Sequence, residues 1–192
     1  LLLETALKMF AEQGIARTSL KDIANESGLT HGALYWHFKN RGDLVAALYE
    51  ECRFPIDDLY LDQLQSARQD ALESLGDFLT EWCDQILNDE RSGYIWRVFH
   101  QGYAYDPELH AISSSIRDEQ GEWIGLLAKL LKKARKQKLV SEKTVAKLDI
   151  SAGAALAIVL GTTQVIAQNA GLANKKQHIR TVVNSFLHGL HA

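Results

Sequence analysis

Apolar residues recur at intervals of three and four along most of the chain, which is the spacing of helices that bury one face. The first such stretch runs from Leu2 to Gln13 and is followed by Gly14, a residue that ends helices because it adopts positive φ at little cost. Nearly every other long segment has the same spacing, and proline is scarce. The chain is therefore predicted to be all-α with about nine helices, the later ones over residues 70–87, 91–101, 107–138, 141–169 and from 174 onward.

Residues 18–41, TSLKDIANESGLTHGALYWHFKNR, predict two short helices joined by a tight turn. Ser19, with Asp22 three residues later, forms a capping pattern for the first helix, and Thr30 caps the second. Gly28 stands where the first helix ends and the chain must turn. The segment therefore has the organisation of a helix-turn-helix.

The second of these helices, from Thr30 to Phe38, has two different sides. Leu34 and Phe38 lie within roughly 40° of each other around the helix axis and form its core side. The remaining positions suit a helix that enters the major groove, because they place small groups at the apex and polar groups on the flanks. These positions are Gly32, Ala33, Tyr35, Trp36 and His37. A small helical hairpin with an ordinary core is the alternative that the same pattern allows.

The motif GLTHGALYWHFKNRGDL, preceded by TSLKDIA, closely resembles the N-terminal domain of TetR-family transcriptional repressors, in particular the AcrR-type regulators of multidrug efflux. The motif is long and specific, and beyond the first quarter the chain matches only in length and helical rhythm. The resemblance implies a three-helix DNA-binding domain over residues 1–45 and a larger ligand-binding and dimerisation domain over 46–192. It also implies a repressor that binds a palindromic operator in double-stranded DNA as a homodimer and is released by a small lipophilic effector.

The DNA contacts of the family are carried over only to matching positions. Residues at the start of the second helix face the bases, with Lys21 helping from the first helix, and the family varies at His31, which makes this residue the candidate for operator choice. Tyr35, His37 and Lys39 hold phosphates, with Ser19 and Arg41 as weaker candidates. The full set is Ser19, Lys21, Thr30, His31, Gly32, Ala33, Tyr35, Trp36, His37, Lys39 and Arg41.

Large aromatic residues come from three successive predicted helices between residues 70 and 138. Between those helices they could line an apolar cavity with a few polar groups, although core packing explains the same residues. The family binds effectors in this domain, and the surrounding acidic residues favour a cationic lipophile. The candidate ligand-binding residues are Phe78, Trp82, Trp96, Phe99, His100, Tyr103, Gln120 and Trp123, with Asp84 as a further polar group.

Small residues recur every four positions along a helix that is predicted to begin at a Ser141 cap and continue to Asn169. Such a row lets two helices approach closely, either within one chain or between two chains. The family forms a four-helix dimer interface from its last two helices. The candidate interface residues are Gly153, Ala157, Gly161, Val165, Val182, Phe186 and Leu190.

Residues 150–174 carry no charged side chain and are long enough to span a bilayer. Polar residues interrupt the segment, and glycine and alanine outnumber leucine in it, so a buried or dimer-forming helix is expected and no membrane contact. No signal peptide is visible, and Cys52 and Cys83 lack metal-ligand or CxxC spacing. Reduced thiols in a cytoplasmic protein, associated with the nucleoid when bound to DNA, are therefore expected.

The net charge of −3 is unlike that of a typical nucleic-acid binder. Within residues 18–41, however, Lys21, Lys39 and Arg41 outnumber Asp22 and Glu26, which leaves a local positive edge for phosphates.

Enzymes form the rival class. The sequence has no P-loop, dinucleotide-binding glycine pattern, HExxH motif or recognisable nucleophile, so no catalytic residue, cofactor or metal is expected. His188 and His191 are three residues apart and could share a metal, but exposed histidines near a terminus are commoner. A helical protein-interaction adaptor without DNA binding is the remaining alternative, although it would have little use for the bare apex at Gly32 and Ala33.

Overall fold

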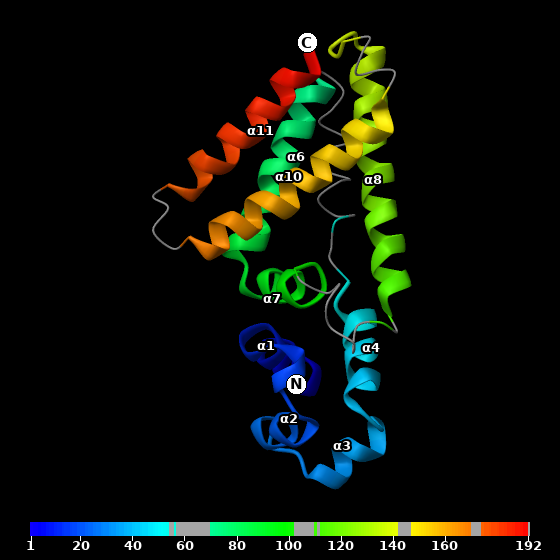
Figure 1. Cartoon of the computed structure of the whole chain (residues 1–192), viewed down its shortest axis with the longest axis vertical. Coiled ribbons are helices and arrows are strands. Elements are labelled where there is room, and N and C mark those ends of the chain that lie inside the picture. The colour runs from blue at the N-terminus through cyan, green and yellow to red at the C-terminus, as the bar shows by residue number, and fades with distance from the viewer. Residues whose placement is uncertain are drawn as a thin grey trace. The chain divides into compact units, whose positions relative to one another are not determined.

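The computed structural model describes residues 1–53, 56, 70–101, 110, 112–141, 147–169 and 174–191. Over these residues the chain forms nine α-helices, one 3₁₀-helix and no strand, so the all-α prediction is confirmed. The helices separate by their mutual contacts into two compact units (Figure 1). The first unit comprises Leu1–Phe54 and Glu90–Asp118, and the second comprises Pro55–Asp89 and Glu119–Ala192.

The first unit begins with a small helical core. Its elements are α1 (Leu2–Gln13), η1 (Ile15–Arg17), α2 (Leu20–Glu26), α3 (His31–His37) and α4 (Arg41–Glu51). Each α-helix turns its apolar stripe inward, and these stripes bury side chains from all four α-helices almost completely. The most deeply buried are Ala6, Leu7, Phe10, Ile23, Ala24, Leu34, Leu44, Val45 and Leu48.

Local capping and turn signals act as the sequence predicts. Ser19 and Asp22 form a complete capping box at the start of α2. The Thr30 side chain accepts a hydrogen bond from the Ala33 N–H at 3.2 Å and so begins α3. Gly14, with a φ angle of 86°, ends α1. Gly28, with a φ angle of 70°, lies in the turn that follows α2. These predictions are confirmed, and they fix where α3 starts.

Helix α7 (Glu90–Phe99) packs against α1 in the first unit. Three side chains on successive turns of α7 bind it there. Arg91 forms a two-pronged ion pair with Glu4, at 3.0 and 3.1 Å, and the Tyr94 hydroxyl lies 3.0 Å from a Glu12 carboxylate oxygen. Arg97 donates to the Ala11 carbonyl at 3.3 Å. The predicted functional boundary at residue 45 stays a prediction, but the packing unit extends beyond it.

The second unit contains α6 (Ala71–Asn88), α10 (Leu148–Gln168) and α11 (Lys175–His191), which contact one another pairwise. Helix α8 (Ser113–Lys136) begins in the first unit and continues into the second. Asp70 caps α6 by accepting from the Leu72 and Glu73 N–H groups, and the Ala71 N–H donates to the Gln137 side chain just after α8. The second unit therefore forms around α6.

Helices α6 and α11 approach closely at Gly76. A Cβ atom at this position would lie 2.7 Å from the Leu187 Cδ1 atom. Carbon atoms in contact normally lie about 3.5–4.0 Å apart, so the absence of a side chain at Gly76 is what allows this spacing.

Several predicted helix boundaries differ from the structure. Phe38 is the half-buried, extended residue after α3 and not its last core residue. The helix that reaches residue 168 begins at Leu148 after Lys147, so Ser141 does not cap it; the Ser141 N–H donates instead to the Leu190 carbonyl at 2.9 Å. Helix α4 ends at Glu51, whereas the predicted breaks at Pro55 and Pro107 lie outside the described residues.

Candidate nucleic-acid interface

Helix α3 is anchored by a single buried residue and exposes the rest of its surface. Leu34 is fully buried, whereas all six other residues of α3 are exposed. Trp36 retains 81% of its surface and Tyr35 retains 52%, which is unusual for side chains of this size. Gly32 has nothing within 4 Å of the place where a Cβ would stand. The apex of α3 is thus narrow and open within its unit.

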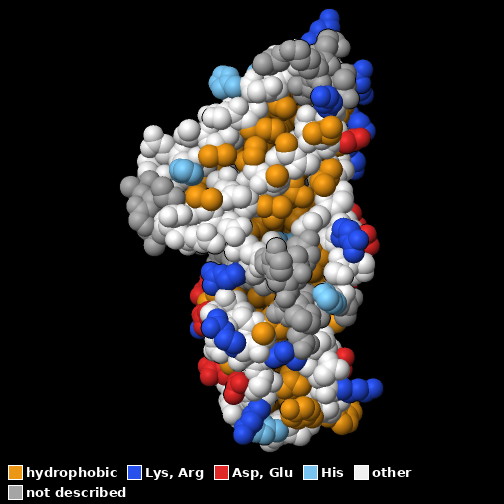
Figure 2. Space-filling model, in the orientation of Figure 1, with side chains coloured by type: hydrophobic (Ala, Val, Ile, Leu, Met, Phe, Trp, Pro, Cys, Tyr) orange, Lys and Arg blue, Asp and Glu red, His pale blue; other side chains and the backbone are white. Residues whose placement is uncertain are grey.

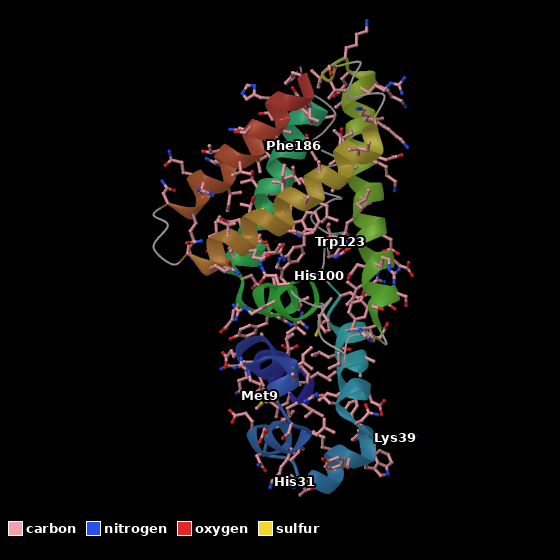
Figure 3. The ribbon with its side chains drawn as sticks, viewed as in Figure 1. Met9, His31, Lys39, His100, Trp123 and Phe186 are labelled. Carbon is pink, nitrogen blue, oxygen red and sulfur yellow. The ribbon has the colours of Figure 1, made fainter. Side chains whose placement is uncertain are left out.

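The predicted contact residues surround this open apex. His31 stands at the start of α3 and Lys39 just after its end, so the two lie near opposite ends of the helix (Figure 3). Lys21, Thr30 and His37 are also exposed. The Lys39 N–H donates to the Asp43 carboxylate at 3.1 Å, which holds the backbone here and leaves the side chain exposed. The structure therefore places nearly the whole predicted set on one exposed edge of the first unit.

Two members of the set also have structural roles. The Arg41 guanidinium donates to the Ala16 and Thr18 carbonyl groups at 3.2 and 3.3 Å and so ties the start of α4 to the residues before α2. Ser19 is part of the capping box, whose hydrogen bonds to the Asp22 carboxylate lower the pKa of Asp22. These contacts are consistent with the weaker DNA role expected of both residues.

The comparisons with known proteins bear on the same residues. Residues 2–48 match the family described as "Bacterial regulatory proteins, tetR family", and this match spans α1 to most of α4. Over these residues the chain is similar to the tetR family. The match includes the capped turn and the exposed helix α3.

Individual relatives point the same way. It is 29% identical over 117 residues to the HTH-type transcriptional regulator AcrR of Shigella flexneri, an alignment that covers 61% of this chain and 54% of AcrR. It is also 33% identical over 108 residues to the HTH-type transcriptional regulator TtgR of Pseudomonas putida, covering 56% of this chain and 51% of TtgR. The chain thus spans about half the length of these curated relatives.

The likeness of the fold extends over nearly the whole length of a solved structure. NalD, the secondary repressor of the MexAB-OprM multidrug efflux pump in Pseudomonas aeruginosa, has a TM-score of 0.78 at 23% identity, and the alignment covers 99% of this chain and 93% of NalD. At these identities the comparison establishes the fold alone.

The predicted ligand-binding residues divide between the two units. Trp82 packs edge-to-face on Trp123 with ring centroids 5.3 Å apart, and Phe78 lies 5.6 Å from Trp82, all within the second unit. Trp96, Phe99 and His100 belong to the first unit, where burial lowers the pKa of His100 to about 3. Gln120 is half-buried, and Tyr103 lies outside the described residues. Inside each unit these aromatic residues pack as core.

The predicted dimer residues lie mostly on accessible parts of α10 and α11. Ala157, Gly161 and Val165 are exposed, and a Cβ at Gly153 or Gly161 would meet nothing within 4 Å. Ala157 and Gly161 are therefore not used for packing within the unit, unlike Ala152 and Ala155 of the same helix, which are fully buried. On α11, Val182 and Phe186 are half-buried and Leu190 is buried. Figure 2 shows apolar side chains gathered over α10 and α11 on this face.

Two further features concern a membrane span and a metal site. Helix α10 is 21 residues long with a mean hydropathy of 1.8 in its most apolar window, and length and composition alone would allow it to cross a membrane. Apolar helices inside water-soluble proteins have the same properties. Within the described ranges, no three His, Cys, Asp or Glu side chains are grouped as metal ligands.

Sequence reasoning overlooked Asn25. Its side-chain oxygen lies 3.0 Å from Nε2 of His31, between the two helices of the helix-turn-helix. The signal was present in the sequence, because a two-helix turn at Gly28 brings residues six positions apart within reach.

Proposed function

We propose that the chain is a ligand-responsive repressor that binds a palindromic operator in double-stranded DNA as a homodimer and is released by a small lipophilic effector. The observation that carries the proposal is the exposure of α3, in which only Leu34 is buried. A helix used only for packing would bury a broad stripe, whereas a recognition helix must leave its apex and flanks free. The protein would act in the cytoplasm and associate with the nucleoid when it is bound to DNA.

The residues around α3 would divide the work between bases and phosphates. Thr30, His31, Gly32 and Ala33 are at the leading turn, where base edges are reached. Tyr35, His37 and Lys39 supply phosphate contacts on the flanks, which set position and not sequence. Because the whole chain has a net charge of −3, affinity depends on this local edge and falls as salt rises.

Dimerisation is supported by the unpartnered apolar face of α10. Ile150 and Val165 expose 68% and 47% of their surface on the same helix as the open Gly153 and Gly161 positions. Two copies of this face can approach closely because its central side chains are small. A twofold dimer then presents two α3 helices to half-sites about one DNA turn apart.

A small lipophilic effector is supported by likenesses to solved structures and by the buried tryptophans of this chain. The solved complex of SmeT with triclosan matches this chain with a TM-score of 0.76 at 24% identity, covering 98% of this chain and 88% of SmeT. NalD represses a multidrug efflux pump. Together with the buried tryptophans of this chain, these likenesses support a flat, lipophilic effector and control of multidrug efflux, and the acidic surface favours a cation.

A gel-shift with the DNA upstream of its own gene tests DNA binding and effector response together. Wild-type protein should bind this DNA more tightly than a random duplex, and triclosan or a cationic dye should release it. His31→Ala should change which operator is preferred, whereas Lys39→Ala should weaken all duplexes alike. Lys8→Ala, which removes an exposed lysine of α1 outside the candidate set, is the matched control. Equal binding to cognate and random DNA by the wild type would contradict the proposal and favour a protein-binding adaptor.

Separate measurements test the other two parts. Ala157→Glu should convert the dimer to a monomer in sedimentation experiments, while Gly125→Glu on the exposed surface of α8 should leave it dimeric. Effector binding should quench the buried tryptophans in a Trp36→Phe variant, which removes the exposed fluorophore. A wild-type monomer at micromolar concentration would contradict the dimer, and no saturable quenching with any lipophile would contradict the effector site.

A further inference from the structure

Asn25 and His31 touch each other where α2 passes into α3. Asn25 Oδ1 is 3.0 Å from His31 Nε2, and both side chains are exposed. The turn enforces the contact: Gly28 has a φ of 70°, and its N–H donates to the Asn25 carbonyl at 3.2 Å. The Leu29 N–H donates in turn to the Ala24 carbonyl at 2.9 Å. The end of α2 is therefore folded against the first residue of α3, which Figure 3 labels at its exposed edge.

This contact determines what the imidazole can offer to a base. A carboxamide oxygen can only accept hydrogen bonds, so the proton of the contact belongs to Nε2 of His31. In a neutral imidazole the other ring nitrogen, Nδ1, then carries a lone pair and accepts. We infer that Asn25 holds His31 in the Nε2–H tautomer, so that His31 reads the operator with Nδ1 as a hydrogen-bond acceptor. The inference rests on the proposed function, because it assigns a role within the DNA contact.

The tautomer restricts the base that His31 can select. In the major groove, hydrogen-bond donors are offered only by the N6 amine of adenine and the N4 amine of cytosine. Guanine presents the N7 and O6 acceptors, and thymine presents O4 and a methyl group. His31 as an acceptor therefore selects adenine or cytosine at its position and disfavours guanine and thymine.

Asn25 acts in this scheme as a positioning residue. It touches His31 and not the base, and it also limits rotation of the ring, which reduces the ordering that DNA binding would otherwise require. Loss of Asn25 frees the ring to turn and to exchange its proton between the two nitrogens. Discrimination at one base position should then fall by roughly tenfold, within the usual range for a single base contact.

The test is selection of binding sites from randomised duplexes, followed by affinity measurements on the selected operator. Wild-type protein should select adenine or cytosine at one position of each half-site that His31→Ala no longer selects. Asn25→Leu, which keeps the size but removes the acceptor, should relax the same position roughly tenfold. Glu26→Gln on the next exposed position of α2 is the control and should leave the preference unchanged.

A double substitution separates positioning from direct contact or a change in folding. If Asn25 acts through His31, adding Asn25→Leu to His31→Ala should cause no further loss of preference. Replacing the selected base by an analogue without the exocyclic amine, purine for adenine or 2-pyrimidinone for cytosine, should reduce wild-type binding and leave His31→Ala binding unchanged.

The contrary results are distinct. Selection of guanine or thymine at the His31 position, or an Asn25→Leu effect that persists in the His31→Ala background, would overturn the inference while leaving the proposed function intact. Failure of the wild-type chain to select any duplex would overturn the proposed function and this inference with it.

Discussion

Substitution of Gly76 by alanine tests how closely α6 and α11 pack. Glycine inside a helix costs about 1 kcal/mol relative to alanine, so in an open position the change should stabilise the protein by about that amount. At Gly76, however, the new Cβ would lie 2.7 Å from Leu187 Cδ1, roughly 1 Å closer than ordinary contact. The distance from the new Cβ to Val183 Cγ1 would be 3.9 Å, which is an ordinary contact and requires no movement.

Leu187 can relieve the clash because it is half-buried and the atom concerned is at the end of its side chain. Turning it away from its present rotamer or losing the burial of one methyl group costs about 1 kcal/mol. The gain in helix propensity and the cost of the clash therefore nearly cancel. We expect Gly76→Ala to leave the free energy of unfolding within about 0.5 kcal/mol of wild type, and to stabilise a Leu187→Ala background by about 1 kcal/mol.

Urea unfolding followed by circular dichroism, at fixed protein concentration, measures these differences. Gly125→Ala on α8 is the control, because a Cβ at Gly125 meets nothing within 4 Å, and it should stabilise both backgrounds by about 1 kcal/mol. If Gly76→Ala were as stabilising in wild type as in Leu187→Ala, the two helices would not approach each other as described.

Three further outcomes follow from buried and capping groups. Burial lowers the pKa of His100 to about 3, so below the usual pKa of 6.5 the unfolded chain gains a proton that the folded chain does not. The free energy of unfolding should therefore fall as the pH drops from about 6.5 toward 3, by at most about 1.4 kcal/mol per pH unit. Urea midpoints of His100→Gln should depend less steeply on pH than those of wild type. Burial raises the pKa of Cys83 to about 12 and also raises that of Cys52, so iodoacetamide at pH 8 should label both thiols slowly in native protein and rapidly in urea; fast native labelling would contradict their burial. Ser19→Ala should cost about 1 kcal/mol of stability, because it removes the α2 cap. The cap also lowers the pKa of Asp22, so the stability that Asp22 contributes should be present above pH 3.8 and be lost as the pH falls through its lower folded pKa. Melts of wild type and Ser19→Ala over this pH range measure both effects, and identical pH dependences would contradict the prediction.

The sequence allowed accurate prediction wherever the physical cause was local. The Ser19 and Thr30 caps, the positive φ of Gly28 and the exposure of Trp36 each depend on residues within one or two helical turns. The partnership of α1 with α7 was not foreseen, because the Arg91–Glu4 pair joins residues 87 positions apart. Surface charges of this kind have many potential partners in a sequence.

The candidate sites show the same division. The positions of the predicted DNA contacts follow from helix periodicity, so the exposed edge around α3 was predicted almost completely. Periodicity identified the buried aromatic residues equally well, but it cannot distinguish a wall around a ligand from a packed core, because both require apolar side chains on the same helix face. Trp82 against Trp123 illustrates this, since edge-to-face packing satisfies either description.

The attachment of α7 to α1 has a consequence for anyone who would isolate the DNA-binding part. A fragment ending at residue 48, where the family match ends, would lose both rings of the Tyr49–Phe99 contact, whose centroids are 5.3 Å apart. It would also lose the arginines that neutralise Glu4 and cover the end of α1. The helix-turn-helix part of the first unit is therefore not an independently folding fragment. Helix α7, which completes this core, begins about forty residues after α4 ends, so the first core cannot close until α7 has been synthesised.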